Sequence, residues 1–301
     1  MDFFERLNET HEGIHGSTCV ALDKFTTLRV GGPADYFAEP QTEEELLLMM
    51  REAKAARIPV LLLGNGSNVL VRDGGFRGLA IRLGKGFSAI ERKDDCLYAQ
   101  AGALLSTLAR QALEASLTGL EFAQGIPGSV GGGVYMNAGA YGGELGQRVE
   151  FVRVLDGETV REIPGSEMAF SYRHTRAMEE QWIILGAQFR LTPGDPKEIE
   201  TAMRDFAARR KEKQPLEYPS AGSFFKRPAG HFAGALIEGA GLKGLTVGGA
   251  QVSEKHAGFL INRGGATASD FLELMRQVQA RVMEKYGVML EPEVRIVGED
   301  K

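Results

Sequence analysis

The stretch Gly125–Gly146, which reads GIPGSVGGGVYMNAGAYGGELG, determines how the rest of this sequence is interpreted. Nine of its 22 residues are glycine, yet it also contains apolar residues such as Val130, Val134 and Met136. A flexible linker would be rich in glycine and serine, with few apolar residues. The composition instead indicates ordered backbone that passes very close to something, because glycine carries no Cβ. Taken alone, the stretch fits tight turns between strands as well as it fits a binding loop for a nucleotide or dinucleotide.

A second glycine loop, Gly64–Asn68, follows a short apolar segment, Pro59–Leu63, which we expect to be a buried strand. Strand followed by Gly-X-Gly superficially suggests a Rossmann fingerprint. However, Val69 stands where the third glycine belongs, and Val69–Val71 followed by a turn predicts a strand rather than a helix. A phosphate cradle of backbone N–H groups, helped by the Ser67 and Asn68 side chains, is therefore the better functional interpretation. A β-turn without a ligand is the alternative.

Composition limits the class of protein. A chain of 301 residues suits two or three domains, and its net charge of -5 argues against general nucleic-acid binding. Cys19 and Cys96 have neither metal-ligand nor disulfide-framework spacing, so we expect reduced thiols and no metal site. Residues 1–13 lack the basic-then-apolar order of a signal peptide, and no apolar run approaches the roughly 18 residues of a membrane span. These features predict a soluble, cytoplasmic protein without membrane insertion.

Apolar periodicity and capping residues predict the regular elements. Residues 1–24 are expected to be irregular or helical, and Leu28 and Val30 suggest a short strand. The expected helices span about residues 42–57, 104–117, 195–211 and 270–286, and the expected later strands span 149–155, 158–163, 182–191, 258–262 and 288–297. A domain boundary near residue 195 is indicated, because β-rich sequence there gives way to a helix capped by Asp195 and Pro196.

Six segments, in order along nearly the whole chain, resemble one known family. They are LRVGGPAD (28–35), LLGNGSNVLV (62–71), GIPGSVGGGVYMNAGAYGGE (125–144), SYRHTR (171–176), AGSFFKRP (221–228) and LEPEVR (290–295). Together they are similar to the UDP-N-acetylmuramate dehydrogenases, also called UDP-N-acetylenolpyruvoylglucosamine reductases. Each short motif alone is weakly specific, whereas six in order are highly specific.

The resemblance implies an α+β fold that binds FAD in the manner of the vanillyl-alcohol-oxidase/PCMH type, with a C-terminal substrate-binding domain. The corresponding division is residues 1–76 and 77–195 for two FAD-binding subdomains and 196–301 for the substrate domain. The chain resembles the shorter type of the family, which lacks a loop that brings a tyrosine over the substrate, because few residues separate Arg176 from Trp182.

The resemblance also implies non-covalent FAD, since neither glycine motif contains a histidine for covalent attachment. The residues expected to contact FAD come from both glycine motifs: Leu63, Gly64, Asn65, Gly66, Ser67, Asn68, Gly125, Pro127, Gly128, Ser129, Gly132, Gly133, Asn137, Ala138 and Gly139.

The implied reaction reduces an enolpyruvyl ether to a lactyl ether in bacterial peptidoglycan precursor synthesis, with NADPH as the electron donor. Arg173 would stabilise charge developing on the substrate carboxylate, because its guanidinium is planar and permanently charged. Ser223 would protonate C2, and Glu293 would assist polarisation or protonation. Without the resemblance, the ordinary interpretations would be a surface ion pair for Arg173, a backbone-bonded strand serine for Ser223, and pairing of Glu293 with Arg295 or another base.

Tyr172, Lys213, Lys226 and Arg227 are candidates for binding the substrate carboxylate or diphosphate, although Arg227 departs from an asparagine found in some relatives. The expected partners are a UDP-sugar and NADPH, with the chain acting as a monomer. Two other functions compete: a flavin oxidase that uses oxygen, against which the GSFFK and LEPEV motifs argue, and a non-catalytic nucleotide-binding protein. The joint presence of Arg173, Ser223 and Glu293 argues against the second.

Overall fold

The computed structural model describes residues 3–10 and 13–301, which form two compact units. Unit 1 contains the chain up to Gly16 together with Phe37–Asn65 and Ala80–Arg210. Unit 2 contains Ser17–Tyr36, Gly66–Leu79 and Lys211–Lys301. The three-part division expected from the sequence stays a prediction.

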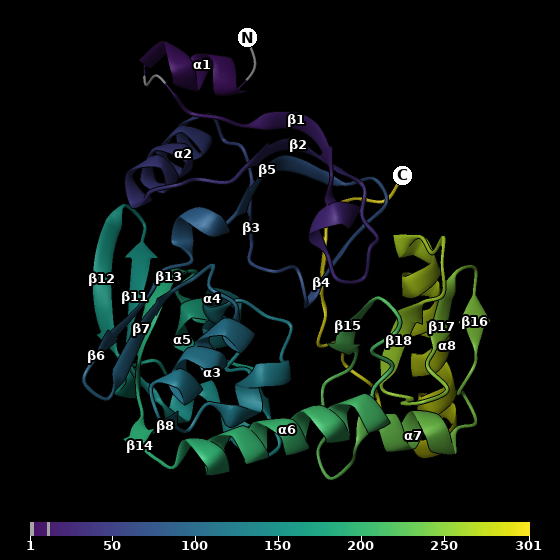
Figure 1. Cartoon of the computed structure of the whole chain (residues 1–301). Helices are drawn as coiled ribbons and strands as arrows, with labels where there is room; N and C mark the ends of the chain where they lie inside the picture. Colours follow the sequence, from purple (N-terminus) through teal and green to yellow (C-terminus); the bar gives the residue numbers. More distant parts are fainter. Residues whose placement is uncertain (1–2, 11–12) are drawn as a thin grey trace. The chain divides into compact units, whose positions relative to one another are not determined.

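Unit 1 is built on an antiparallel sheet of five strands in the order β12-β11-β13-β7-β6 (Figure 1). Its strands are β6 (Ile90–Lys93), β7 (Cys96–Gln100), β11 (Val149–Asp156), β12 (Thr159–Pro164) and β13 (Ile183–Arg190). β11, β12 and β13 confirm the three strands expected between residues 149 and 191. Gly157 lies in the two-residue turn between β11 and β12 with φ 61, a left-handed conformation that suits a tight hairpin.

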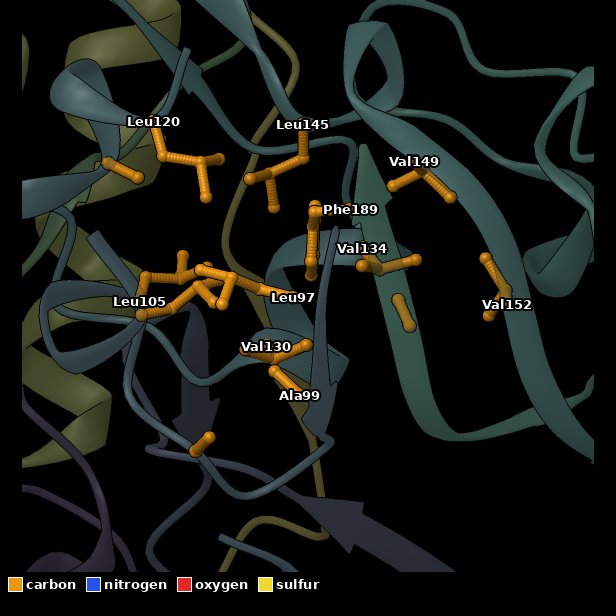
Figure 2. Packing of buried hydrophobic residues seen from close by; sticks show 14 of the residues in the cluster. Leu97, Ala99, Leu105, Leu120, Val130, Val134, Leu145, Val149, Val152 and Phe189 are labelled. Carbon is orange, nitrogen blue, oxygen red and sulfur yellow. The ribbon is translucent and has the colours of Figure 1, made fainter. Parts of the chain in front are cut away.

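Two helices supply the apolar side chains that pack with this sheet. α3 (Leu105–Glu114) buries Leu105 and Leu108, and α4 (Val130–Tyr135), inside the glycine-rich stretch, buries Val130 and Val134. Figure 2 shows Leu105, Val130 and Val134 together with side chains of β7, β11 and β13 around Phe189, which is fully buried. The apolar residues of the glycine-rich stretch thus belong to the core of unit 1.

Two of the other helices in unit 1 begin after a capping side chain. α2 (Glu43–Ala55) begins after Thr42, whose hydroxyl accepts a hydrogen bond from the Glu45 N–H at 3.2 Å. α5 (Arg176–Glu179) is a single turn, and α6 (Pro196–Lys213) is a long helix that passes into unit 2 at Arg210/Lys211. Asp195 accepts from the Lys197 N–H at 2.9 Å, as expected for a residue that caps α6.

Unit 2 contains an antiparallel sheet in the order β15-β18-β17-β16, and α8 runs alongside β17 (Figure 1). The strands are β15 (Ser220–Ser223), β16 (Thr246–Val247), β17 (Ala250–Val252) and β18 (Phe259–Asn262), and the helices are α7 (Ala233–Gly239) and α8 (Ala268–Tyr286). α8 begins with a capping box between Thr267 and Asp270 and ends at Gly287, which has φ 67.

A parallel pair in unit 2 joins β4 (Val69–Val71) to β19 (Arg295–Val297). β4 confirms that a strand, not a Rossmann helix, follows the Gly64–Asn68 loop. The last strand is shorter than the expected 288–297 and begins only at Arg295. Pro292, which has no N–H for a ladder, makes only an isolated bridge, to Phe225.

The amino-terminal third forms α1 (Phe3–Thr10) and a sheet in the order β1-β2-β5-β3. Its strands are β1 (Ser17–Ala21), β2 (Pro33–Ala38), β3 (Val60–Leu63) and β5 (Phe76–Arg82). β1 was not anticipated within residues 1–24, of which 1–2 and 11–12 lie outside the described residues. The expected strand at Leu28 and Val30 was wrong: both residues are buried, but Arg29 between them has φ 54, which is incompatible with extended backbone.

Two short antiparallel pairs complete the fold. β8 (Leu117–Thr118) pairs with β14 (Thr192–Pro193), and β9 (Gly139–Ala140) pairs with β10 (Gly143–Glu144). No helix within the described ranges is both long and apolar enough to cross a membrane.

Replacing Phe189 with alanine should lower the free energy of unfolding of unit 1 by about 3–5 kcal/mol, because it empties a site at the centre of the core. Urea unfolding followed by the fluorescence of Trp182, the single tryptophan and a member of the same core, measures this loss. Phe232→Ala is the control, since Phe232 is 63% exposed and should change the value by less than about 0.5 kcal/mol. A loss below 1 kcal/mol for Phe189→Ala would contradict its central place.

Candidate active site

The two glycine motifs meet at Gly64 and Asn65, which belong to unit 1 together with residues 125–146. The Asn65 side-chain amide donates a hydrogen bond to the Pro127 carbonyl at 2.7 Å. A Cβ on Gly64 would lie 2.2 Å from the Ser129 hydroxyl oxygen, so only glycine permits this approach. Segments 62 residues apart in sequence are therefore in direct contact at the end of β3.

The loop Gly64–Asn68 presents unused backbone donors. Among the described residues, the N–H groups of Asn65, Gly66, Ser67 and Asn68 donate no hydrogen bond within the protein. The carbonyls of Gly66 and Asn68 are engaged instead, accepting from Thr27 N–H at 3.1 Å and Arg295 N–H at 3.0 Å. Gly66 has φ 61, and a Cβ there would lie 1.9 Å from the Phe25 carbonyl oxygen. Successive free N–H groups in one loop are the donor set that binds phosphate, so this loop fits a dinucleotide cofactor.

The three glycines of α4 differ in how closely other atoms approach them. A Cβ on Gly131 would lie 2.8 Å from the Ala101 Cβ, and one on Gly133 would lie 2.9 Å from methyl carbons of Leu105 and Leu145. Both glycines therefore let α4 approach its neighbours closely. Gly132 is exposed, and a Cβ there would meet only the Ser129 hydroxyl, at 3.6 Å. Gly132 is thus the glycine of this helix that offers open surface to a ligand.

The first backbone donors of α4 are already used within the protein. Val130 N–H donates to the Ala103 carbonyl and Gly131 N–H to the Ala101 carbonyl, both at 2.8 Å. The Ser129 hydroxyl caps the helix by accepting from Gly132 N–H at 3.5 Å. The donors for an anionic ligand therefore lie in the Gly64–Asn68 loop rather than at the start of α4.

Polar side chains from two segments lie beside Gly125. Within the described part of the chain, the Gln124 side-chain oxygen is buried without a hydrogen-bond partner. The Arg210 guanidinium, from α6, lies against Gly125, where an added Cβ would be 2.9 Å from Nη1. Burial lowers the pKa of Arg210. A buried amide oxygen without a partner and a nearby guanidinium at this edge of the glycine-rich stretch fit a polar ligand. No sequence pattern indicated that Arg210 would lie there.

The remaining candidate cofactor residues are enclosed by protein to different extents. Leu63 is 2% exposed at the end of β3, and the buried Gly128 accepts a hydrogen bond from Leu105 N–H at 3.0 Å. Ala138 and Gly139 are half-buried, and Gly139 pairs with Glu144 in the β9–β10 hairpin. Asn137 is buried and hydrogen-bonded on three sides.

Arg173 lies at the tip of a tight turn in unit 1. Ser171 and His174 exchange backbone hydrogen bonds at 3.1 and 3.2 Å, so Tyr172 and Arg173 form the turn between them. Arg173 has φ 56, a left-handed conformation that is unusual for a bulky residue and typical of functional positions. Its guanidinium lies 5.0 Å from the centre of the Tyr172 ring, which is 47% exposed. The turn therefore carries a cation and an aromatic ring side by side.

In unit 2 the motifs of Ser223 and Glu293 are brought onto neighbouring segments. Glu293 N–H donates to the Phe224 carbonyl at 2.8 Å, and Lys226 N–H donates to the Glu291 carbonyl at 2.9 Å. Ser223 is exposed at the end of β15, while Phe224 beside it is fully buried and stacks on Phe271 of α8. The core thus fixes the backbone on which the exposed serine is presented.

The Asn68 side chain also belongs to this arrangement. Its amide donates to the Glu293 carbonyl at 3.1 Å, so Asn68 holds the backbone of the glutamate through its side chain. Its backbone N–H stays available for a ligand. The sequence had indicated only a cofactor contact for this residue.

The candidate substrate-binding residues are distributed over both units. Tyr172 belongs to unit 1, whereas Lys213, Lys226 and Arg227 belong to unit 2. Lys226 forms an ion pair with Glu291 at 3.4 Å, and the Arg227 guanidinium lies 4.6 Å from the centre of the Phe232 ring. Lys213 is exposed at the end of α6.

The Asn65–Pro127 hydrogen bond joins the two glycine motifs, residues 65–68 offer free N–H donors, and a strand stands where a Rossmann fold has a helix. These features fit a protein that binds a dinucleotide without a Rossmann fold. The family model described as FAD binding domain matches residues 34–161. The model described as UDP-N-acetylenolpyruvoylglucosamine reductase, C-terminal domain, matches residues 214–297.

Relatives match along nearly the whole chain. The UDP-N-acetylenolpyruvoylglucosamine reductase of Agathobacter rectalis is 52% identical, with 92% of both chains covered. That of Clostridioides difficile is 49% identical, with 93% of this chain and 92% of the relative covered. The crystal structure of the Thermus caldophilus enzyme (MurB) superposes with a TM-score of 0.82 at 38% identity, covering 94% of this chain and 98% of that one.

The chain belongs to the UDP-N-acetylenolpyruvoylglucosamine reductase (MurB) family. This confirms the resemblance drawn from the six motifs and the α+β fold with an FAD-binding part and a C-terminal reductase domain. It also establishes FAD as the cofactor class and the chain as an oxidoreductase.

Gly131→Ala and Gly132→Ala separate packing from ligand approach in α4. Gly131→Ala should lower the free energy of unfolding by about 1–3 kcal/mol, because its methyl group would collide with Ala101. Gly132→Ala should leave stability unchanged or raise it by up to about 1 kcal/mol, because alanine is the better helix former. It should nevertheless weaken FAD binding. Trp182 fluorescence in urea and a titration of apoprotein with FAD measure the two effects. Unchanged FAD affinity in Gly132→Ala would remove Gly132 from the cofactor contacts.

Proposed function

We propose that this protein reduces UDP-N-acetylenolpyruvoylglucosamine to UDP-N-acetylmuramate with electrons from NADPH, a step in bacterial peptidoglycan precursor synthesis. The activity for which its relatives are named supports this substrate. The structural observation that carries the proposal is the backbone pairing of residues 224–226 with 291–293, because it sets the motifs of Ser223 and Glu293 on adjacent segments. Bound FAD supplies the two-electron transfer from NADPH to C3 of the enolpyruvyl group.

FAD is held without a covalent bond by the two glycine motifs. The free N–H groups of residues 65–68 bind its diphosphate, and Gly132 and the backbone around Pro127 border the rest of the cofactor. The hydrogen bond from Asn65 to Pro127 supports this assignment, since it fixes one motif against the other before any ligand binds. A cradle formed in advance reduces the ordering cost of binding.

Arg173 stabilises the negative charge that develops on the substrate carboxylate as C3 is reduced. Its guanidinium keeps its charge at any physiological pH and can donate two parallel hydrogen bonds to a carboxylate. The turn from Ser171 to His174 supports this role, because it presents the arginine from a fixed backbone. Fixed donors aimed at developing charge are usually the largest single contribution to catalysis.

Ser223 donates its hydroxyl proton to C2, and the resulting alkoxide recovers a proton before the next turnover. Serine is a weak acid, so the transfer requires a site that stabilises the alkoxide. Gly222, with φ 75, turns the chain just before Ser223, and the buried Phe224 anchors it just after. These neighbours support Ser223 as a hydroxyl held in one position rather than a mobile surface group.

Glu293 assists polarisation or protonation of the enolpyruvyl group. Its backbone is fixed on both sides, by donation to the Phe224 carbonyl and by acceptance from the Asn68 amide. A carboxylate on such a support reaches the same point in each turnover, as acid–base catalysis requires.

Tyr172, Lys213, Lys226 and Arg227 bind the carboxylate or diphosphate of the UDP-sugar in this proposal. We further infer that the protein works as a cytoplasmic monomer, with FAD-binding subdomains at residues 1–76 and 77–195 and a substrate-binding domain at 196–301. The matched family models, at 34–161 and 214–297, support the last boundary.

Anaerobic titration with NADPH distinguishes the reductase from the alternatives. The flavin absorbance of the purified protein should bleach with NADPH and return when UDP-N-acetylenolpyruvoylglucosamine is added. A flavin that ignores NADPH but reacts with oxygen after reduction by a sugar or alcohol would favour the oxidase. A flavin that is reduced but never reoxidised by the UDP-sugar would favour a non-catalytic binding protein.

Ser223→Ala should retain FAD and its reduction by NADPH but lose nearly all reoxidation by the enolpyruvyl sugar, because only the proton donor is removed. Stopped-flow absorbance measures both half-reactions separately. Ser220→Ala, at the other end of β15, is the matched control and should react at nearly the normal rate. Near-normal reoxidation in Ser223→Ala would rule out Ser223 as the proton donor.

A further inference from the structure

Asn137 is a buried residue of the glycine-rich stretch whose side chain is occupied by protein groups. It is 1% exposed, with φ 42. Its Nδ2 donates to the Glu144 carboxylate and to the Ser171 carbonyl, both at 3.0 Å, and its Oδ1 accepts from Gly146 N–H at 2.9 Å. Both amide protons are therefore engaged, and one of the two acceptor positions of the oxygen is filled.

These partners also determine the orientation of the amide. The Ser171 carbonyl and the Glu144 carboxylate can only accept, whereas the Gly146 N–H can only donate. Rotating the amide by 180° would set its oxygen against two other oxygens and its NH₂ against an N–H. Asparagine fits this site with one orientation, and no other side chain of its size offers two donors and an acceptor in the same plane.

Ser171, whose carbonyl accepts from Asn137, is the first residue of the turn that carries Arg173. On the other side of this turn, the fully buried Thr175 donates its hydroxyl proton to the Tyr135 carbonyl at 2.9 Å. Tyr135 ends α4, and Asn137 follows it two residues later. The turn is thus tied on both sides to the carboxyl end of α4, by Asn137 through Ser171 and by Thr175 through Tyr135.

We propose that Asn137 is a positioning residue for Arg173: its carboxamide ties the Tyr172–Arg173 turn to the glycine-rich stretch, so that the cofactor-binding backbone and the catalytic cation are held as one piece. This inference rests on the role of Arg173 in the proposed function. It gives the side chain of Asn137 a different task from the cofactor contact expected from the sequence.

The conformation of Arg173 explains why such an anchor is needed. A bulky residue with φ 56 persists only where the surrounding structure holds it. A turn with free flanks would relax and let the guanidinium sample many positions. A displacement of about 1 Å in a catalytic group slows reactions by about 100-fold, so the anchors act on the chemistry without touching the substrate.

Asn137→Asp tests the proposal, because it keeps the size of the side chain and tolerates positive φ but removes both N–H donors. It also sets a second carboxylate beside Glu144. Stopped-flow absorbance of the holoenzyme should show flavin reoxidation by UDP-N-acetylenolpyruvoylglucosamine slowed by about 10- to 100-fold. Reduction by NADPH and the dissociation constant of FAD, measured by titrating apoprotein, should stay within about threefold, because neither depends on Arg173.

Two further variants keep the test decisive if Asn137→Asp is poorly folded. Thr175→Val keeps the shape of the side chain but removes the hydroxyl that bonds to Tyr135, and it should slow the same half-reaction. Asn8→Asp in α1 is the matched control: Asn8 also donates twice to carbonyls, of Phe4 and Ile14, and accepts from Ile14 N–H. It lies outside the candidate site and should reoxidise normally.

A double-mutant cycle shows whether Asn137 acts through Arg173. In the Arg173→Ala background, Asn137→Asp should cause little further slowing, because the group that it positions is gone. Full additivity of the two effects would overturn the proposal. So would normal reoxidation in both Asn137→Asp and Thr175→Val, or a loss of FAD affinity as the main effect, which would return Asn137 to the cofactor contacts.

The outcome for Arg173 alone separates this inference from the proposed function. If Arg173→Ala reoxidises normally, the role of Arg173 in the proposed function fails, and the positioning role fails with it. If Arg173→Ala is slow and Asn137→Asp is normal, the proposed function stands and only the present inference is overturned.

Discussion

The close approach of α4 to the segment that follows β7 is the contact on which the arrangement of unit 1 depends. The carbonyls of Ala101 and Ala103 accept the first two N–H groups of α4, and Gly131 brings the two backbones together because it has no Cβ. Val130 and Val134 then enter the core around Phe189 (Figure 2). Once α4 is fixed in this way, the residues on either side of it are fixed too.

Both ends of α4 serve the candidate site. Before the helix, the Pro127 carbonyl receives the amide of Asn65 and so holds the Gly64–Asn68 loop, whose N–H groups are free for a phosphate. After the helix, Asn137 and the Tyr135 carbonyl hold the turn that carries Arg173. A short helix with three glycines is thus the common support of the Gly64–Asn68 loop and the turn that carries Arg173, which explains why glycine and apolar residues are interleaved there.

In unit 2, the backbone that carries Ser223 and Glu293 is restrained in a similar way, by a buried neighbour and by hydrogen bonds between two segments. Phe224, the residue next to the exposed Ser223, is buried and packs on Phe271. The backbone hydrogen bonds between residues 224–226 and 291–293 place Glu293 on the neighbouring segment. A buried neighbour on one side and a hydrogen-bonded partner segment on the other restrain the backbone of Ser223 while its side chain stays exposed. In both units the candidate catalytic residues lie on backbone that buried neighbours restrain.

The sequence alone determined the family and, through its six motifs, the α+β class. It also predicted a strand rather than a Rossmann helix after Gly66, and most helices and strands, because glycine spacing, capping residues and apolar periodicity are local properties of the chain. It misjudged Leu28 and Val30, since their apolar pattern is the same in a strand and in a buried loop and only the left-handed Arg29 tells them apart. Only the tertiary structure decided which glycines of α4 pack and which face outward, that Arg210 lies against Gly125, and that Asn137 bonds to Ser171. These depend on which segments distant in sequence come within a few ångströms of one another, and residue types along one chain do not specify that.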